Sequence, residues 1–194
     1  FLHYLVLKLK HSHLHRVTPM FSKQILTVLA FATLFAVNIT VSQSAEPVLS
    51  LSGGRTAFPN ADTVHGWVFT AHQPILVTHL GLYDADSLGM SIEHPIGIYR
   101  LSDSQLITSG TINAGTGDAL IEGFRYIDTP DVTLDASEEY VIAAYSSASF
   151  VDFLILEAEG LVVDPVITYG PNRLIESAAG GLILPTQVTF GDRF

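Results

Sequence analysis

Short apolar or alternating runs, each closed by a turn signal, fill the chain after Pro47. Glycine, proline, aspartate, asparagine or serine interrupts the pattern about every 8–12 residues, which is typical of an antiparallel β-sandwich or barrel. Residues 140–145 carry apolar side chains on both faces, which predicts a central strand. Further strands are predicted at 65–69, 75–83, 95–101, 106–112, 123–127, 132–134, 150–156, 160–163, 166–169, 182–184 and 187–190. We therefore predict one all-β domain.

An export signal precedes this domain. Residues 20–23 (Met-Phe-Ser-Lys) give a positively charged start, residues 25–37 are apolar, and small residues at 41–45 suit cleavage. The apolar run is too short for a stable membrane span, which needs about 20 residues. We predict a signal peptide with a signal helix at 20–45, a single domain at 46–194, and a non-native upstream extension at 1–19. The mature protein is then secreted or displayed at the cell surface.

The charge of residues 46–194 excludes several partners and chemistries. This part holds five arginines, no lysine and nineteen acidic residues, a net charge of −14. Such a surface repels nucleic acid and anionic membranes. Without lysine, neither a Schiff base nor a phosphate-loop lysine can exist here. The chain also lacks cysteine, so the domain is stabilised by its core without disulfides.

Several segments, taken in order, resemble a known family. They are Leu-Gly-Leu-Tyr-Asp at 80–84, His-Pro-Ile-Gly-Ile-Tyr at 94–99, Gly-Phe-Arg-Tyr at 123–126, Tyr-Val-Ile-Ala-Ala-Tyr at 140–145 and Asp-Pro-Val-Ile-Thr-Tyr-Gly at 164–170. Together they resemble the domain of unknown function found in exported, PEP-CTERM-sorted bacterial proteins. The resemblance implies a β-sandwich of jelly-roll type and an association with exopolysaccharide. Family members usually continue into a sorting segment, which is not present here up to Phe194, so release and truncation both stay open.

Local catalytic signatures are absent from the sequence. It contains neither a Gly-x-Ser-x-Gly elbow nor a His-Glu-x-x-His pair. The four histidines after residue 45 (His65, His72, His79 and His94) are scattered singly. A catalytic triad can assemble from distant positions, so a secreted hydrolase with a dispersed site stays an alternative. We predict that the protein is not an enzyme.

Two acidic loops are candidates for metal binding. Asp84 and Asp86, followed by Glu93, place hard oxygen ligands in and around the loop after a predicted strand, and calcium takes 6–8 such oxygens. The second loop holds the acidic residues 128, 131 and 135. Aspartates in loops also cap turns through their side chains, which is the structural alternative for both loops. One structural calcium ion at Asp84, Asp86 and Glu93 is the cofactor hypothesis.

Aromatic and arginine side chains suggest a ligand-binding cleft. Tyr99 and Tyr126 each lie beside an arginine, where they could line a polar cleft, whereas Trp67 shares a strand face with Phe69 and is expected in the core. Arg125 could grip a carboxylate of a ligand. The alternative for Arg125 is an ion pair with a nearby acid such as residue 122 or 128. Tyr99, Arg125 and Tyr126 are the candidate ligand-binding residues.

Together these features predict a non-catalytic exported module of the cell envelope or extracellular matrix, with extracellular polysaccharide as its candidate partner. A structural or adhesive surface spacer without a small ligand is the second hypothesis. An exposed aromatic cleft would favour the first, and a surface without a concavity would favour the second.

Overall fold

A computed structural model of the chain describes residues 5–10, 45–57, 59, 61–148, 152, 154–177 and 180–189. These residues form strands, turns and loops and include no helix, so this part of the protein is all-β as predicted. No helix capable of crossing a membrane occurs in this part of the chain. Apart from Ala45, the predicted signal peptide at 20–45 lies outside the described residues.

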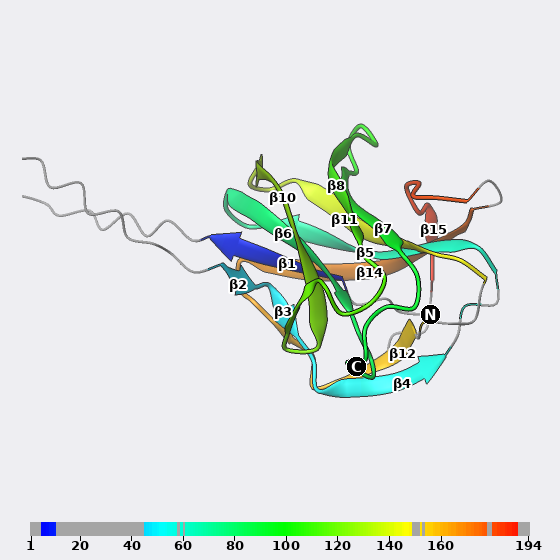
Figure 1. The fold of residues 1–194 in the computed structure, drawn as a ribbon. Helices are drawn as coiled ribbons and strands as arrows, with labels where there is room; N and C mark the ends of the chain where they lie inside the picture. Colours follow the sequence, from blue (N-terminus) through cyan, green and yellow to red (C-terminus); the bar gives the residue numbers. More distant parts are fainter. Residues whose placement is uncertain are drawn as a thin grey trace, which may run out of the picture.

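The first large sheet has five antiparallel strands in the order β2-β1-β6-β10-β9. Its strands are β2 (Glu46–Pro47), β1 (Leu5–Lys10), β6 (Ile75–Tyr83), β10 (Phe124–Leu134) and β9 (Ala119–Ile121). Strand β1 comes from the segment that the sequence interpretation assigns to an upstream extension, and it lies between β2 and β6 (Figure 1).

The second large sheet has six antiparallel strands in the order β15-β14-β5-β11-β7-β8. They are β15 (Gln187–Val188), β14 (Ile167–Glu176), β5 (Thr63–Ala71), β11 (Glu139–Ser146), β7 (His94–Arg100) and β8 (Leu106–Ile112). Strand β11 pairs with β5 on one side and β7 on the other, which confirms the central strand predicted at 140–145.

Two small sheets complete the described structure: β12 (Leu154–Glu159) pairs with β4 (Gly53–Ala57), and β13 (Val162–Val163) pairs with β3 (Leu49–Ser50). Figure 1 shows β4 and β12 running below the larger sheets. The sequence interpretation missed β4 because its Gly-Gly-Arg-Thr-Ala stretch has no apolar alternation.

One apolar core joins the two large sheets into a sandwich-like body. Leu80 and Leu82 of β6 and Phe124 of β10 belong to the same buried cluster as Trp67 of β5 and Ile142 of β11. Trp67 is fully buried and stacks against Tyr169 at a centroid distance of 4.9 Å, which confirms its predicted place in the core.

The six-stranded sheet is also buried on its other face. Val141 and Ala143 of β11 belong to a second, smaller cluster, against which Leu182 and Leu184 pack. The sequence interpretation placed a strand at 182–184, and this is wrong, because these residues form an irregular segment that covers the sheet. An apolar run of three residues looks the same whether it pairs as a strand or packs side-on over one.

The predicted pair of short strands at 123–127 and 132–134 is a single strand, β10. Its register against β6 shifts between Asp128 and Val132, so Pro130 lies in a bulge. Proline has no N–H to give to the ladder and is tolerated in a strand at such an irregularity.

Candidate functional site

Arg125 lies at the centre of a buried polar cluster. Its side chain is almost fully buried, and its Nε donates to Oδ2 of Asp84 at 2.9 Å. Nη1 donates to the carbonyl oxygens of Asp118 at 3.1 Å and Thr116 at 3.4 Å, and Nη2 donates to that of Ser87 at 3.2 Å. Arg125 therefore joins β10 to the loop after β6 and to the segment before β9.

The loop after β6 is shaped to deliver Asp84 to this arginine. The Asp84 N–H donates to the Gly123 carbonyl at 2.8 Å, and its Oδ2 also accepts the Gly89 N–H at 3.0 Å. Gly89 has a φ of 99°, which a residue with a side chain rarely adopts. Arg125 therefore forms an ion pair, which is the structural alternative that the sequence suggested. Its partner is Asp84, whereas the sequence suggested residues 122 or 128.

The three candidate ligand-binding residues do not form a single cleft. Tyr99 is opposite Val141 in the six-stranded sheet, whereas Arg125 and Tyr126 are on β10 of the other sheet. Tyr99 is 7% exposed and Tyr126 3% exposed. Burial raises the pKa of both phenols, and a negative Glu122 adds to the rise at Tyr126.

Tyr126 lies across a glycine on the neighbouring strand. The two residues are opposite each other in register, and a Cβ on Gly81 would lie 2.6 Å from Cε1 of the tyrosine ring. The absence of a side chain at Gly81 is what lets the ring approach β6 this closely.

The structure brings together only part of the proposed calcium set. Asp84 and Asp86 line a small cavity of about 30 Å³, and its third acidic residue is Asp152, while Glu93 does not line it. Among the described residues, no group of three or more histidine, cysteine or acidic side chains is arranged to hold a metal. The guanidinium of Arg125 already supplies positive charge to Asp84. Calcium stays a prediction, which calorimetry with calcium and a chelator would test.

A second buried polar cluster, around His94 and Asp152, was not predicted. His94 Nε2 lies 2.9 Å from Asp152 Oδ2, and its Nδ1 lies 3.1 Å from the carbonyl oxygen of Tyr145. The residues are 58 positions apart, so no local sequence signal could have paired them.

The carboxylate of this pair is held by backbone groups as well. Asp152 accepts the N–H groups of Ser91 at 2.7 Å and Ile92 at 3.2 Å. Burial acts to raise the pKa of Asp152, but the hydrogen bonds from His94 and Ser91 outweigh it and hold that pKa below its usual value. The pair thus fixes the beginning of β7 to residue 152.

His65 is a buried titratable group that neither cluster uses. It is 3% exposed and hydrogen-bonds to Thr63, and burial lowers its pKa from the usual 6.5 to about 3. As the pH falls below 6.5, the unfolded chain takes up a proton that the folded chain refuses, so stability falls with pH until about pH 3.

We expect this one histidine to cost on the order of 3 kcal/mol of stability between pH 7 and pH 4. Urea unfolding at a series of pH values measures the slope. His65→Gln should flatten it, and the exposed His72→Gln is the matched control. An unchanged slope in His65→Gln would show that the acid sensitivity arises elsewhere.

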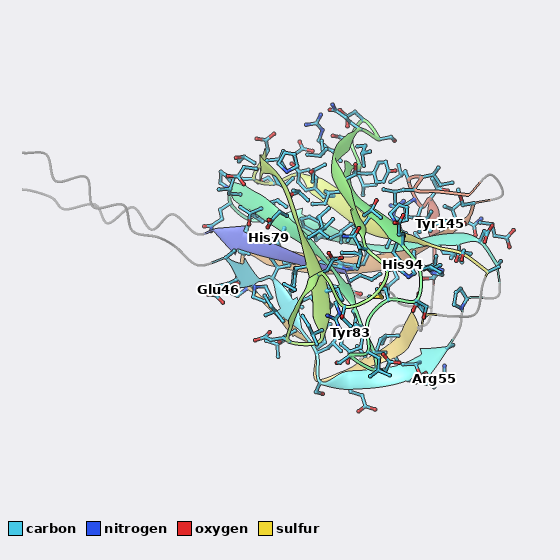
Figure 2. All side chains as sticks on the ribbon, in the orientation of Figure 1. Glu46, Arg55, His79, Tyr83, His94 and Tyr145 are labelled. Atoms are coloured by element: carbon cyan, nitrogen blue, oxygen red, sulfur yellow. The ribbon has the colours of Figure 1, made fainter. Side chains whose placement is uncertain are left out.

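A shallow groove opens over β6, β9 and β10. It has a volume of about 300 Å³, and its walls include His79, Asp118, Ile121, Tyr126, Ile127 and Asp128. We call it the β6–β10 groove. Figure 2 shows His79 by the β1 and β6 end of the molecule, away from His94 near β7.

Polar groups of the β6–β10 groove are held in place by neighbours. His79 Nε2 lies 2.8 Å from Asp128 Oδ1, and its Nδ1 lies 2.7 Å from Thr78 Oγ1. Asp118 accepts the N–H and the side-chain amide of Asn113 at 2.6 and 2.8 Å. The Asp128 side chain is 91% exposed, so its carboxylate is open to a ligand. Of the predicted ligand-binding residues, Tyr126 is the one that lines this groove.

A second groove, of about 360 Å³, lies between residues 46–50 and residues 162–165, with Glu122 beside it. Its polar side chains are Glu46, Ser50, Glu122 and Asp164, and its wall includes two prolines, Pro47 and Pro165.

The fold and these sites define an all-β, sandwich-like protein of antiparallel sheets whose buried polar pairs tie its loops together. Comparison with protein-family models, with curated proteins and with solved structures gave no match.

Proposed function

We propose that the protein is a non-catalytic exported module of the cell envelope or extracellular matrix that binds a neutral polysaccharide in the β6–β10 groove. The observation that carries the proposal is the composition of that groove, in which the polar groups of His79, Asp118 and Asp128 stand beside the apolar side chains of Ile121 and Ile127. Sugar rings present hydroxyl groups at their edges and apolar C–H groups on their faces, so a site of this mixed kind suits them.

The charge of the protein favours a neutral polymer over an acidic one. Residues 46–194 have a net charge of −14, which repels anionic chains. Arg125, the residue considered for gripping an acidic sugar, already donates to four acceptors of the protein itself. The same proposal has three further parts. The protein is exported by a signal peptide at 20–45, its sandwich has a jelly-roll arrangement, and it is related to PEP-CTERM-sorted proteins.

Binding should depend on the acidic and histidine side chains of the groove. We expect His79→Ala and Asp128→Ala each to weaken retention on a neutral polysaccharide about 10-fold or more, because a hydrogen bond to a charged group is worth roughly 1.5–3 kcal/mol. Glu157→Ala is the matched control, since Glu157 is an exposed acid paired with Arg55 outside the groove. Affinity electrophoresis against a panel of neutral and acidic polysaccharides provides the measurement.

A structural spacer is the second candidate, and one observation favours it. Two buried polar pairs, Arg125 with Asp84 and His94 with Asp152, are bound within the protein and tie loops to strands. A folded protein that no polysaccharide retains, with or without calcium, would move the assignment to the spacer. Equal loss of retention in the Glu157→Ala control would show that the binding is not specific to the groove.

A further inference from the structure

Strand β1 fills an interior place in a sheet that is otherwise built from the exported domain. Leu5–Lys10 pairs antiparallel with β6, from Leu5 opposite Leu82 to Lys10 opposite Leu76 (Figure 1). On the far side of β1 lies only the two-residue strand β2. Without β1, most of the length of β6 is an open sheet edge.

The sequence of β6 is that of an interior strand. Its nine residues, Ile-Leu-Val-Thr-His-Leu-Gly-Leu-Tyr, include no proline, lysine, aspartate or glutamate. Natural edge strands are protected by prolines, charges or shortness, because a row of unpaired N–H and C=O groups recruits another strand. Among the described residues, three edge strands of the two large sheets, β2, β9 and β15, are short, with two, three and two residues, whereas the fourth, β8, has seven residues and no proline or charge. Strand β6 has none of these protections.

Export would detach β1 from the domain. Cleavage at the small residues 41–45 separates Leu5–Lys10 from Glu46 and all that follows. We propose that the β6 edge is a strand-acceptor site that, in the exported domain, takes an extended peptide with the alternating apolar and basic chemistry of Leu5–Lys10. The inference rests on the proposed export only for the removal of β1.

Charge and register indicate which peptide the site prefers. Residues 7–10 of β1 read Leu-Lys-Leu-Lys, and the acceptor domain has a net charge of −14. Lys8 is opposite His79, and His79 is in turn paired with the exposed Asp128. Main-chain hydrogen bonds supply affinity in such strand addition, and alternate side chains supply specificity.

The test uses the full chain with a specific protease site inserted after Ala45. After cutting, the purified protein is challenged with a fluorescent synthetic peptide of residues 3–12, and anisotropy reports binding. We expect saturable binding at one peptide per domain. A peptide of the same composition whose leucines and lysines are reordered to break the alternation should bind at least 10-fold more weakly, and so should one with glutamate in place of lysine.

Backbone methylation separates strand pairing from general stickiness. In an added strand, alternate N–H groups face the acceptor. N-methylation of one alternate set of peptide nitrogens should therefore abolish binding, while methylation of the other set should weaken it far less. Equal effects of the two sets would overturn the proposal.

Each remaining outcome also decides the question. If the cut domain unfolds when β1 leaves and the added peptide restores it, the acceptor site is confirmed; a domain that stays unfolded with the peptide refutes it. If the cut domain instead forms a stable dimer that excludes the peptide, the β6 edge pairs with a second copy of the domain, and the proposed peptide occupant is refuted. The peptide-binding test uses purified, cut protein and does not depend on export. A finding that cells do not export the protein would therefore not change the binding result.

Discussion

Replacing Arg125 by methionine is expected to destabilise the protein by about 3–5 kcal/mol, because it leaves a buried carboxylate without its counter-charge. Asp84 is 4% exposed, and the arginine Nε is the cationic donor to it, at 2.9 Å. The substitution also removes the donors to three loop carbonyl groups. Urea unfolding followed by the fluorescence of Trp67, the single tryptophan, measures the loss.

The double variant Asp84→Asn with Arg125→Met distinguishes an unpaired charge from lost packing. A neutral amide can still accept the Gly89 N–H, so we expect the double variant to recover at least half of the stability that Arg125→Met loses. Arg55→Met is the matched control, since Arg55 forms an exposed pair with Glu157 and should change the unfolding midpoint far less. If Arg125→Met is no more harmful than Arg55→Met, the buried pair does not stabilise the fold.

Gly66→Ala should be the most damaging small substitution in the centre of the six-stranded sheet. Gly66 is opposite Ala143 of β11, and an added Cβ would overlap the carbonyl oxygen of Ile142 and lie 3.0 Å from the Cα of Ala143. These are backbone atoms of the central strand, which cannot rotate away as a side chain can. We expect a loss of about 3 kcal/mol or more, at the upper end of overpacking costs.

Gly117→Ala provides the matched control in the same chain. A Cβ at Gly117 would meet nothing within 4 Å, and the residue is exposed. Such a change reduces the freedom of the unfolded chain and is neutral or slightly stabilising. Thermal unfolding of the two variants should differ clearly, and equal melting temperatures would show that β5 and β11 separate enough to admit a methyl group.

Secondary structure was largely predictable from the sequence because the alternation of apolar residues and the turn residues that end each strand are local properties. Residues 75–83 and 106–112 coincide with β6 and β8, and the two-sided apolar run at 140–145 lies in the central strand β11. Where the prediction was wrong, a non-local packing choice decided the outcome. Residues 182–184 cover a sheet face instead of forming a strand, and β10 continues past Pro130 through a bulge.

The candidate site was less predictable, because ligand-like residue types also serve structure. Arg125 was a candidate ligand-binding residue with an ion pair as the alternative, and its partner Asp84 is 41 positions away. Tyr99 and Tyr126 sit beside arginines in the sequence, yet both rings are buried, in different sheets. No sequence signal pairs His79 with Asp128, although adjacent strands place His79 Nε2 2.8 Å from Asp128 Oδ1.

The sequence by itself therefore determined the β class, the strong negative charge and the central strand, since each follows from composition or from spacing along the chain. Only the tertiary structure decided which acids pair with Arg125 and His94, which side chains line the β6–β10 groove, and what lies along β6. The physical reason is that strand order and register bring together residues tens of positions apart. The local periodicity of the sequence does not specify which strands pair or in which register.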